Sequence, residues 1–180
     1  MSEIIVEARN ILTQFGENIV HEDLNFSVKK GEIVGLVGGS GTGKSVLLNT
    51  ILGLKQPEGG EVYIHGQNRA EMKDSDRENL NNQLGVLFQG GALFSSLSVR
   101  QNIMVPMREH TDLPVELMRE LADMKINMVG LPGNAAPLKP SDLSDGMRKR
   151  AGLARSLALD PSILFLDCLL YTSPSPRDRG

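Results

Sequence analysis

One glycine-rich segment in the first third of the chain has the residue types that hold phosphate groups. Glycines let the backbone curl so that successive N–H groups point at the phosphates, and a helix that follows adds its positive end. A lysine supplies a charge near the β- and γ-phosphates, and a serine offers a hydroxyl to magnesium. The segment that predicts such a P-loop, and with it the binding of a nucleoside triphosphate, is Gly38-Gly39-Ser40-Gly41-Thr42-Gly43-Lys44-Ser45.

The residues on both sides of this loop support the prediction, because a P-loop lies between a strand and a helix. Glu32 to Val37 is continuously apolar after its first residue, which predicts a strand buried on both faces. Ser45 to Leu54 has apolar residues at helical spacing, with Gly53 at its end. A glycine-rich turn without a ligand would have no need of these neighbours.

Other segments predict the elements around the loop. Glu3 to Ala8 and Leu24 to Val28 alternate apolar with polar residues, which indicates antiparallel strands joined by a turn near Gly16. Further strands are predicted at residues 61–64, 84–88 and 162–166. Ser144 is a plausible N-cap for a helix that runs through Leu157. A helical stripe that we expect in the core is formed by Leu117, Leu121, Met124 and Met128.

Composition excludes several classes of protein. With 180 residues and 40% hydrophobic content the chain is long enough for a core. The 19 basic and 22 acidic side chains give a net charge of -3 and no reason to expect nucleic acid as a partner. The apolar stretches are strand-sized, no secretory signal opens the chain, and the single Cys168 suits the cytosol.

The last residues have a different character from the rest. Composition shifts abruptly after Asp167, and residues 168–178 match one translated reading frame of a common transposase sequencing adapter. We therefore expect residues 1–167 to be an incomplete nucleotide-binding domain and residues 168–180 to be a non-native tail. The native residue at position 167 could then be Asp or Glu.

The order of the remaining motifs over residues 3–167 resembles the ABC ATPase family. Phe15 lies where the family has an aromatic residue that stacks on adenine, and Val20 would pack beside the ribose. Gln89, at the end of Gly85 to Gln89, looks like the Q-loop glutamine that reaches magnesium and the attacking water. Asp167, after four apolar residues, resembles the Walker B carboxylate that binds magnesium.

The segment Leu143 to Met147 resembles the family's signature, which faces the γ-phosphate of ATP held by another subunit. The resemblance implies that Ser144 gives a hydroxyl and Gly146 a backbone N–H to that phosphate. Asp145 departs from the family, which has glycine there, and Arg148 and Lys149 could offset its charge.

A larger departure is the residue after Asp167. The family has its general-base glutamate there, and this chain has Cys168. His21, His65 and His110 all precede the signature, so none can be the family's switch histidine, and we expect them to be exposed. This chain is accordingly expected to bind ATP without efficient hydrolysis, unless it fails to fold.

Within the family, the chain is similar to the Mla-type ATPases that work with MCE lipid-transfer proteins, on the evidence of Gly85 to Leu97, Val105 to Pro114 and Leu143 to Leu157. The resemblance implies an α/β fold with a RecA-like P-loop NTPase core, an antiparallel β subdomain and a helical subdomain over about residues 98–158. It also implies ATP and Mg²⁺ as cofactors, a homodimer of nucleotide-binding subunits, and a permease subunit that holds the protein on the cytoplasmic side of the inner membrane. The alternative is a soluble ABC-type ATPase without a permease.

Overall fold

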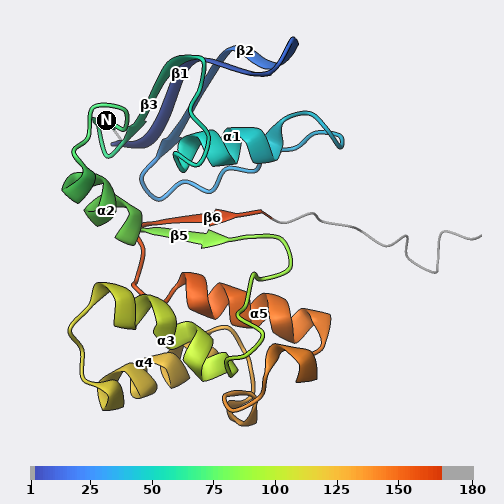
Figure 1. The fold of residues 1–180 in the computed structure, drawn as a ribbon, viewed down its shortest axis with the longest axis vertical. Helices are drawn as coiled ribbons and strands as arrows, with labels where there is room; N and C mark the ends of the chain where they lie inside the picture. The colour runs from blue at the N-terminus through green and yellow to red at the C-terminus, as the bar shows by residue number, and fades with distance from the viewer. Residues whose placement is uncertain (1–2, 168–180) are drawn as a thin grey trace, which may run out of the picture. The chain divides into compact units, whose positions relative to one another are not determined.

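The structure, a computed structural model, describes residues 3 to 167. The chain divides into two compact units, Met1–Asn79 and Leu80–Gly180 (Figure 1). The first unit combines an antiparallel sheet with a helix, and the second combines two strands with a group of helices. The expectations for the tail and for Cys168 lie outside the described residues.

The sheet of the first unit has four strands in the order β2-β1-β3-β4. β1 (Ile4–Phe15) and β2 (Asn18–Lys29) form the expected antiparallel hairpin, with Phe15 opposite Asn18. Gly16 in the turn has a φ of 59°, a conformation that glycine adopts without steric cost. β3 (Gly59–Ile64) pairs with β1, and the short β4 (Gln67–Asn68) pairs with β3.

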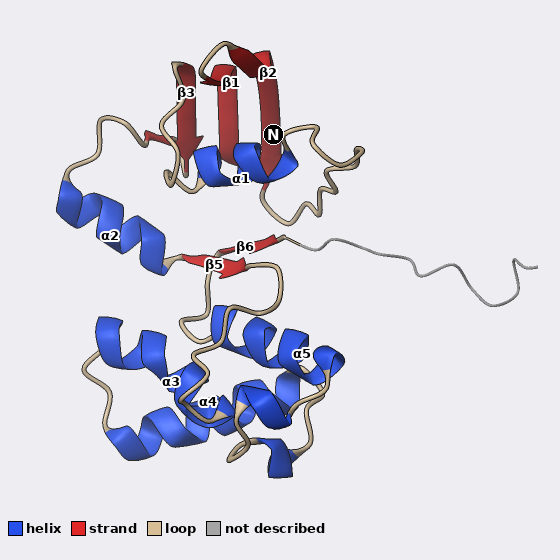
Figure 2. Ribbon diagram, turned by 45° about the vertical axis from the view of Figure 1, so that its right-hand side comes forward, coloured by secondary structure: helices blue, strands red, loops and turns tan. Residues whose placement is uncertain are grey.

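One helix, α1 (Lys44–Ile51), packs on this sheet (Figure 2). Leu47 and Ile51 on the helix are buried, as are Ile11 and Ile64 on the strands. Full burial of a side chain such as Ile51 stabilises the fold by about 1.5–3 kcal/mol. The helix ends before Gly53, whose φ is 72°, so the predicted helix is confirmed.

The prediction of a strand at Glu32 to Val37 is wrong. This segment is irregular, and the Ile33 and Val37 side chains are each 99% exposed. A strand exists through hydrogen bonds to a neighbour, and among the described residues no strand pairs with this backbone. An apolar run indicates that its side chains favour burial, but a strand also requires a partner for its backbone hydrogen bonds.

The second unit contains a parallel pair of strands, β5 (Leu84–Leu87) and β6 (Ile163–Leu166), both of which were predicted. Leu84 lies opposite Ile163 and Leu87 opposite Leu166, so the two strands end together. α2 (Asp74–Asn82) precedes β5 and crosses the boundary between the units.

The segment of the chain between β5 and β6 forms the expected helical subdomain. It consists of α3 (Val99–His110), α4 (Val115–Met128) and α5 (Asp145–Ser156), with 3-10 turns at Gly133–Ala135 and Pro140–Asp142. Ser98 and Gln101 form a capping box at the start of α3, which satisfies N–H groups that the helix leaves free. The core of this subdomain includes Val99, Ile103 and Met107 from α3.

The expectation that Leu117, Leu121, Met124 and Met128 lie in the core is wrong for all of them except Leu121, which packs against the core. Leu117, Met124 and Met128 are 39%, 46% and 60% exposed, and Leu121 is half-buried. α4 instead buries the stripe displaced by one residue, which contains Met118, Ala122, Lys125 and Ile126. A lysine in that stripe hides it from a hydrophobicity pattern, and only its ion pair with Asp160 makes the burial tolerable.

Candidate nucleotide-binding site

The P-loop leads directly into α1 and has the backbone that its glycines permit. Gly41 and Gly43 have φ of 82° and 88°, in the left-handed region that other residues rarely adopt. A Cβ atom at Gly38 would lie 2.8 Å from Thr42 Oγ1. The loop therefore depends on glycine at these three positions for its present course.

The Lys44 ammonium group lies among the oxygens of the loop. Nζ donates to the carbonyl oxygens of Gly38 and Gly39 at 2.7 and 2.6 Å, and to Thr42 Oγ1 at 3.3 Å. Ser45 is exposed in the first turn of α1, and no acidic residue of that turn offsets the positive end of the helix. The predicted ammonium and hydroxyl groups thus lie beside a loop suited to an anion.

The hairpin supports the last glycine of the loop. Gly43 is buried, and a Cβ atom there would lie 2.6 Å from Val20 Cγ1 and 2.5 Å from His21 Nε2. Val20 is therefore next to the P-loop, as its predicted place beside the nucleotide requires. Its contact with a ribose stays a prediction.

The expectation that the histidines are exposed is wrong for His21. The residue lies on β2, is 8% exposed, and its Nδ1 is hydrogen-bonded to Thr13 Oγ1 at 2.7 Å. Burial lowers the pKa of His21 below its usual 6.5, because the charged ring is poorly solvated there. His110, at the end of α3, is exposed, and His65, after β3, is half-buried.

Sequence reasoning missed that Thr13 orients His21 beside the P-loop. The two residues are direct cross-strand partners in the predicted hairpin. The turn pairs Phe15 with Asn18 and Gln14 with Ile19, but an irregularity between Gln14 and Thr13 shifts the register by one residue, so a count from the turn would not have paired Thr13 with His21. Nothing in the sequence alone indicated that His21 also meets Gly43.

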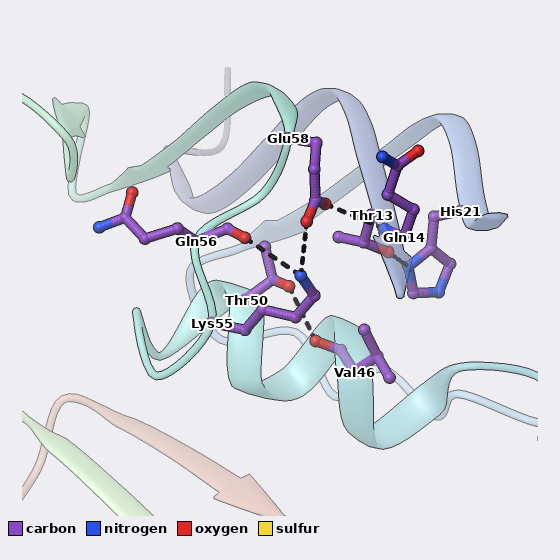
Figure 3. Close-up of polar contacts among 8 residues, drawn as sticks. All are labelled: Thr13, Gln14, His21, Val46, Thr50, Lys55, Gln56 and Glu58. Atoms are coloured by element: carbon purple, nitrogen blue, oxygen red, sulfur yellow. Dashed lines mark hydrogen bonds and ion pairs between the residues drawn. The ribbon is translucent and has the colours of Figure 1, made fainter. Parts of the chain in front are cut away.

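Phe15 ends β1 and is 56% exposed, so its ring is accessible for stacking. Lys55 Nζ lies 4.8 Å from the ring centroid and 3.0 Å from the Glu58 carboxylate. That carboxylate also accepts the backbone N–H of Gln14 at 2.9 Å (Figure 3). The hydrogen bond from Lys55 is the main cause that lowers the pKa of Glu58. Adenine stacking on Phe15 remains a prediction.

Gln89 and Asp167 follow the paired strands of the second unit. The Asp167 N–H donates to the Leu87 carbonyl oxygen at 2.9 Å, which places Asp167 next to the end of β5, two residues before the exposed Gln89. Within residues 3–167, no three His, Cys, Asp or Glu side chains gather as a metal site. The predicted ligands of Mg²⁺ are Ser45 in the first unit and Gln89 and Asp167 in the second, and their joint binding of the ion stays a prediction.

The signature segment begins α5. Ser144 is the N-cap, and its hydroxyl accepts the Met147 N–H at 3.3 Å. Ser144 and Gly146 are both exposed, so both could reach a second molecule. Asp145 pairs with Arg148 at 2.9 Å, which offsets its charge as the sequence suggested.

These features define the class of an ATP-binding cassette, with a P-loop and antiparallel hairpin in one unit and paired strands with a helical subdomain in the other. The chain matches the family described as ABC transporter over residues 21–168, and it belongs to that family. In the described part, no helix is long and apolar enough to cross a bilayer.

Individual relatives agree with this assignment. The intermembrane phospholipid transport system ATP-binding protein MlaF of Haemophilus influenzae is 42% identical over the whole chain, which spans 67% of that protein. The probable ribonucleotide transport ATP-binding protein mkl of Mycobacterium leprae is 40% identical over 91% of the chain, which spans 47% of it. The dimeric ATP-binding cassette MJ0796, solved with ADP and Pi, is similar with a TM-score of 0.82 and 31% identity, over 90% of this chain and 73% of that one.

Proposed function

We propose that this chain is the ATP-binding subunit of an ABC transporter that moves phospholipid between membranes. The observation that best supports nucleotide binding is the P-loop at the start of α1. Lys44 lies within its curve, and no acidic side chain in the first turn opposes an anion. Each of these features favours a bound triphosphate.

The side chains have distinct roles in this proposal. Lys44 leaves the loop carbonyl oxygens and neutralises charge on the β- and γ-phosphates. Ser45, Gln89 and Asp167 hold the ion that accompanies ATP, and Gln89 also orients water, which an uncharged amide can do. Magnesium, when bound, screens the charge of the triphosphate. Positioning and charge neutralisation would support hydrolysis in an intact family member. This sequence has Cys168 where the family has the glutamate that activates water, so we expect it to bind ATP without efficient hydrolysis.

A second copy of the chain completes the site. Ser144 and Gly146 lie at the exposed start of α5, where a hydroxyl and a backbone N–H can meet the γ-phosphate of ATP on the other copy. The similar cassette MJ0796 is dimeric in its solved form, which supports this arrangement. We therefore place Ser144 of one copy opposite Lys44 of the other.

The proposed cargo rests on the relatives. MlaF of Haemophilus influenzae is named for phospholipid transport, whereas mkl of Mycobacterium leprae is named for probable ribonucleotide transport at nearly the same identity. We favour phospholipid because the MlaF match extends over the whole chain. The partners would then be a permease in the inner membrane, to which the protein binds from the cytoplasm, and an MCE-type lipid-binding protein.

Titration of the purified chain with Mg-ATP tests the nucleotide site. We expect saturable binding that is lost in Lys44→Ala, because the loop then lacks its only ammonium group. Equal binding by the two proteins would overturn the proposed site. For the cargo, the gene product with its native residues after Asp167, together with its permease, should move labelled phospholipid between vesicles in an ATP-dependent way. Movement of ribonucleotide instead would favour the other assignment.

A further inference from the structure

The edge of the His21 ring lies against the backbone of the P-loop. Gly43 is the residue before α1, and a Cβ atom there would be 2.5 Å from His21 Nε2 and 3.0 Å from Cε1. These distances leave room for a glycine and for no larger residue. The imidazole therefore contacts the P-loop at the residue where the chain enters α1.

The ring is held in this orientation from its other side. His21 Nδ1 is hydrogen-bonded to Thr13 Oγ1 at 2.7 Å, and Thr13 is fully buried on β1 (Figure 3). Since Thr13 and His21 face each other across the hairpin, the bond fixes the ring relative to the sheet. The orientation that satisfies Nδ1 is the one that turns Nε2 toward Gly43.

This contact matters because the rest of the loop is poorly packed. Residues 31–42 are all exposed, and Gly43 is the first buried residue on the way into α1. A loop that is fixed before the ligand arrives loses less conformational entropy on binding. The contact between His21 and Gly43 is thus the point at which the hairpin can fix the loop before a ligand binds.

We propose that His21, oriented by Thr13, is a positioning residue that fixes the P-loop backbone at Gly43. It acts on nucleotide affinity through the N–H groups of Gly43, Lys44 and Ser45, and it does not touch the nucleotide itself. The inference rests on the proposed ATP site, but its effect on the loop exists without a ligand.

Three variants separate the packing of the ring against Gly43 from general destabilisation. His21→Ala removes the ring, whereas Ile51→Val shortens a buried side chain at the end of α1, the helix that follows the loop. The double variant His21→Phe with Thr13→Val keeps a ring against Gly43 and removes both ends of the hydrogen bond, so that no buried polar group is left unpaired.

Mg-ATP binding is measured for the full 180-residue chain at a temperature where circular dichroism shows each variant folded. We expect the dissociation constant to rise about tenfold in His21→Ala, the effect of ordering about one further residue on binding. Ile51→Val and the double variant should stay within about threefold of the original chain. Equal effects of His21→Ala and Ile51→Val, at matched loss of thermal stability, would overturn the proposal.

Hydrogen exchange of the ligand-free chain gives the second readout. His21→Ala should speed exchange of the N–H groups at residues 41–45, and Ile51→Val should not do so selectively. If the original chain fails to bind Mg-ATP, the proposed function is wrong, and the exchange rates still decide whether His21 fixes the loop. Unchanged exchange at residues 41–45 in His21→Ala would contradict the inference in either case.

Discussion

Lys125 brings its ammonium group into the core of the helical subdomain, where it pairs with the carboxylate of Asp160. The Lys125 side chain is only 2% exposed, whereas that of Asp160 is 80% exposed. Burial of an ammonium ion is costly unless an opposite charge accompanies it. Asp160 has a φ of 50°, a conformation that Asp and Asn tolerate better than most residues. The carboxylate is thus held where the buried lysine needs it.

Loss of this carboxylate should destabilise the fold. Asp160→Asn keeps the size and backbone preference of the residue, and we expect it to lower the free energy of unfolding by about 2 kcal/mol, because Lys125 is left buried without a counter-charge. Lys125→Met should stay within about 1 kcal/mol of the original chain, since an apolar side chain replaces the charge. Urea unfolding of the full chain measures both.

The matched control is Asp74→Asn. Asp74 is fully exposed and pairs with Arg77 at 3.3 Å, so its loss should change stability by less than about 0.5 kcal/mol. Similar effects of Asp160→Asn and Asp74→Asn would show that the Lys125 pair is no stronger than a surface pair.

The stability of the chain should depend on pH through the titration of His21. Burial lowers its folded-state pKa below 6.5, so the unfolded chain takes up the proton at a higher pH than the folded chain. The contribution of His21 is fully present above pH 6.5 and is lost as the pH falls through the lower folded-state pKa. We expect the melting temperature of the original chain to fall more between pH 7.5 and 5 than that of the His21→Phe, Thr13→Val variant. Parallel pH profiles would contradict this.

Phe15 should contribute to nucleotide affinity with little effect on stability. A base that stacks on an aromatic side chain gains about 1–3 kcal/mol, so Phe15→Ala should weaken ATP binding at least about fivefold. Phe15→Tyr should retain affinity because the ring remains. Phe94→Ala is the control, because Phe94 is also about half exposed and also lies beside a cation, Arg155. A comparable loss of affinity in Phe94→Ala would argue against stacking on Phe15.

ATP turnover by this sequence should be negligible although ATP binds. The residue after Asp167 is Cys168, and a thiol does not replace the glutamate that activates water in the family. Phosphate release by the purified chain should therefore equal that of Lys44→Ala. Magnesium-dependent release by the original chain alone would show that another group activates the water.

Much of the fold follows from local signals. The alternation in β1 and β2, the turn at Gly16 and the helix that ends before Gly53 were all predicted, because strand period, turn residues and helix ends are encoded by neighbouring residues. The same holds for the parallel strands β5 and β6, since a short apolar run next to turn residues suffices to indicate a strand.

The sequence by itself therefore determined the phosphate loop, the order of motifs and the family. Only the tertiary structure decided that Ile33 to Val37 forms no strand, that α4 buries the stripe with Lys125, and that His21 lies against Gly43. Each of these depends on a partner distant in the chain: a neighbouring strand, a carboxylate at Asp160, or a glycine 22 residues after the histidine. Local patterns state what a residue prefers, and the packing of distant segments decides whether that preference is met.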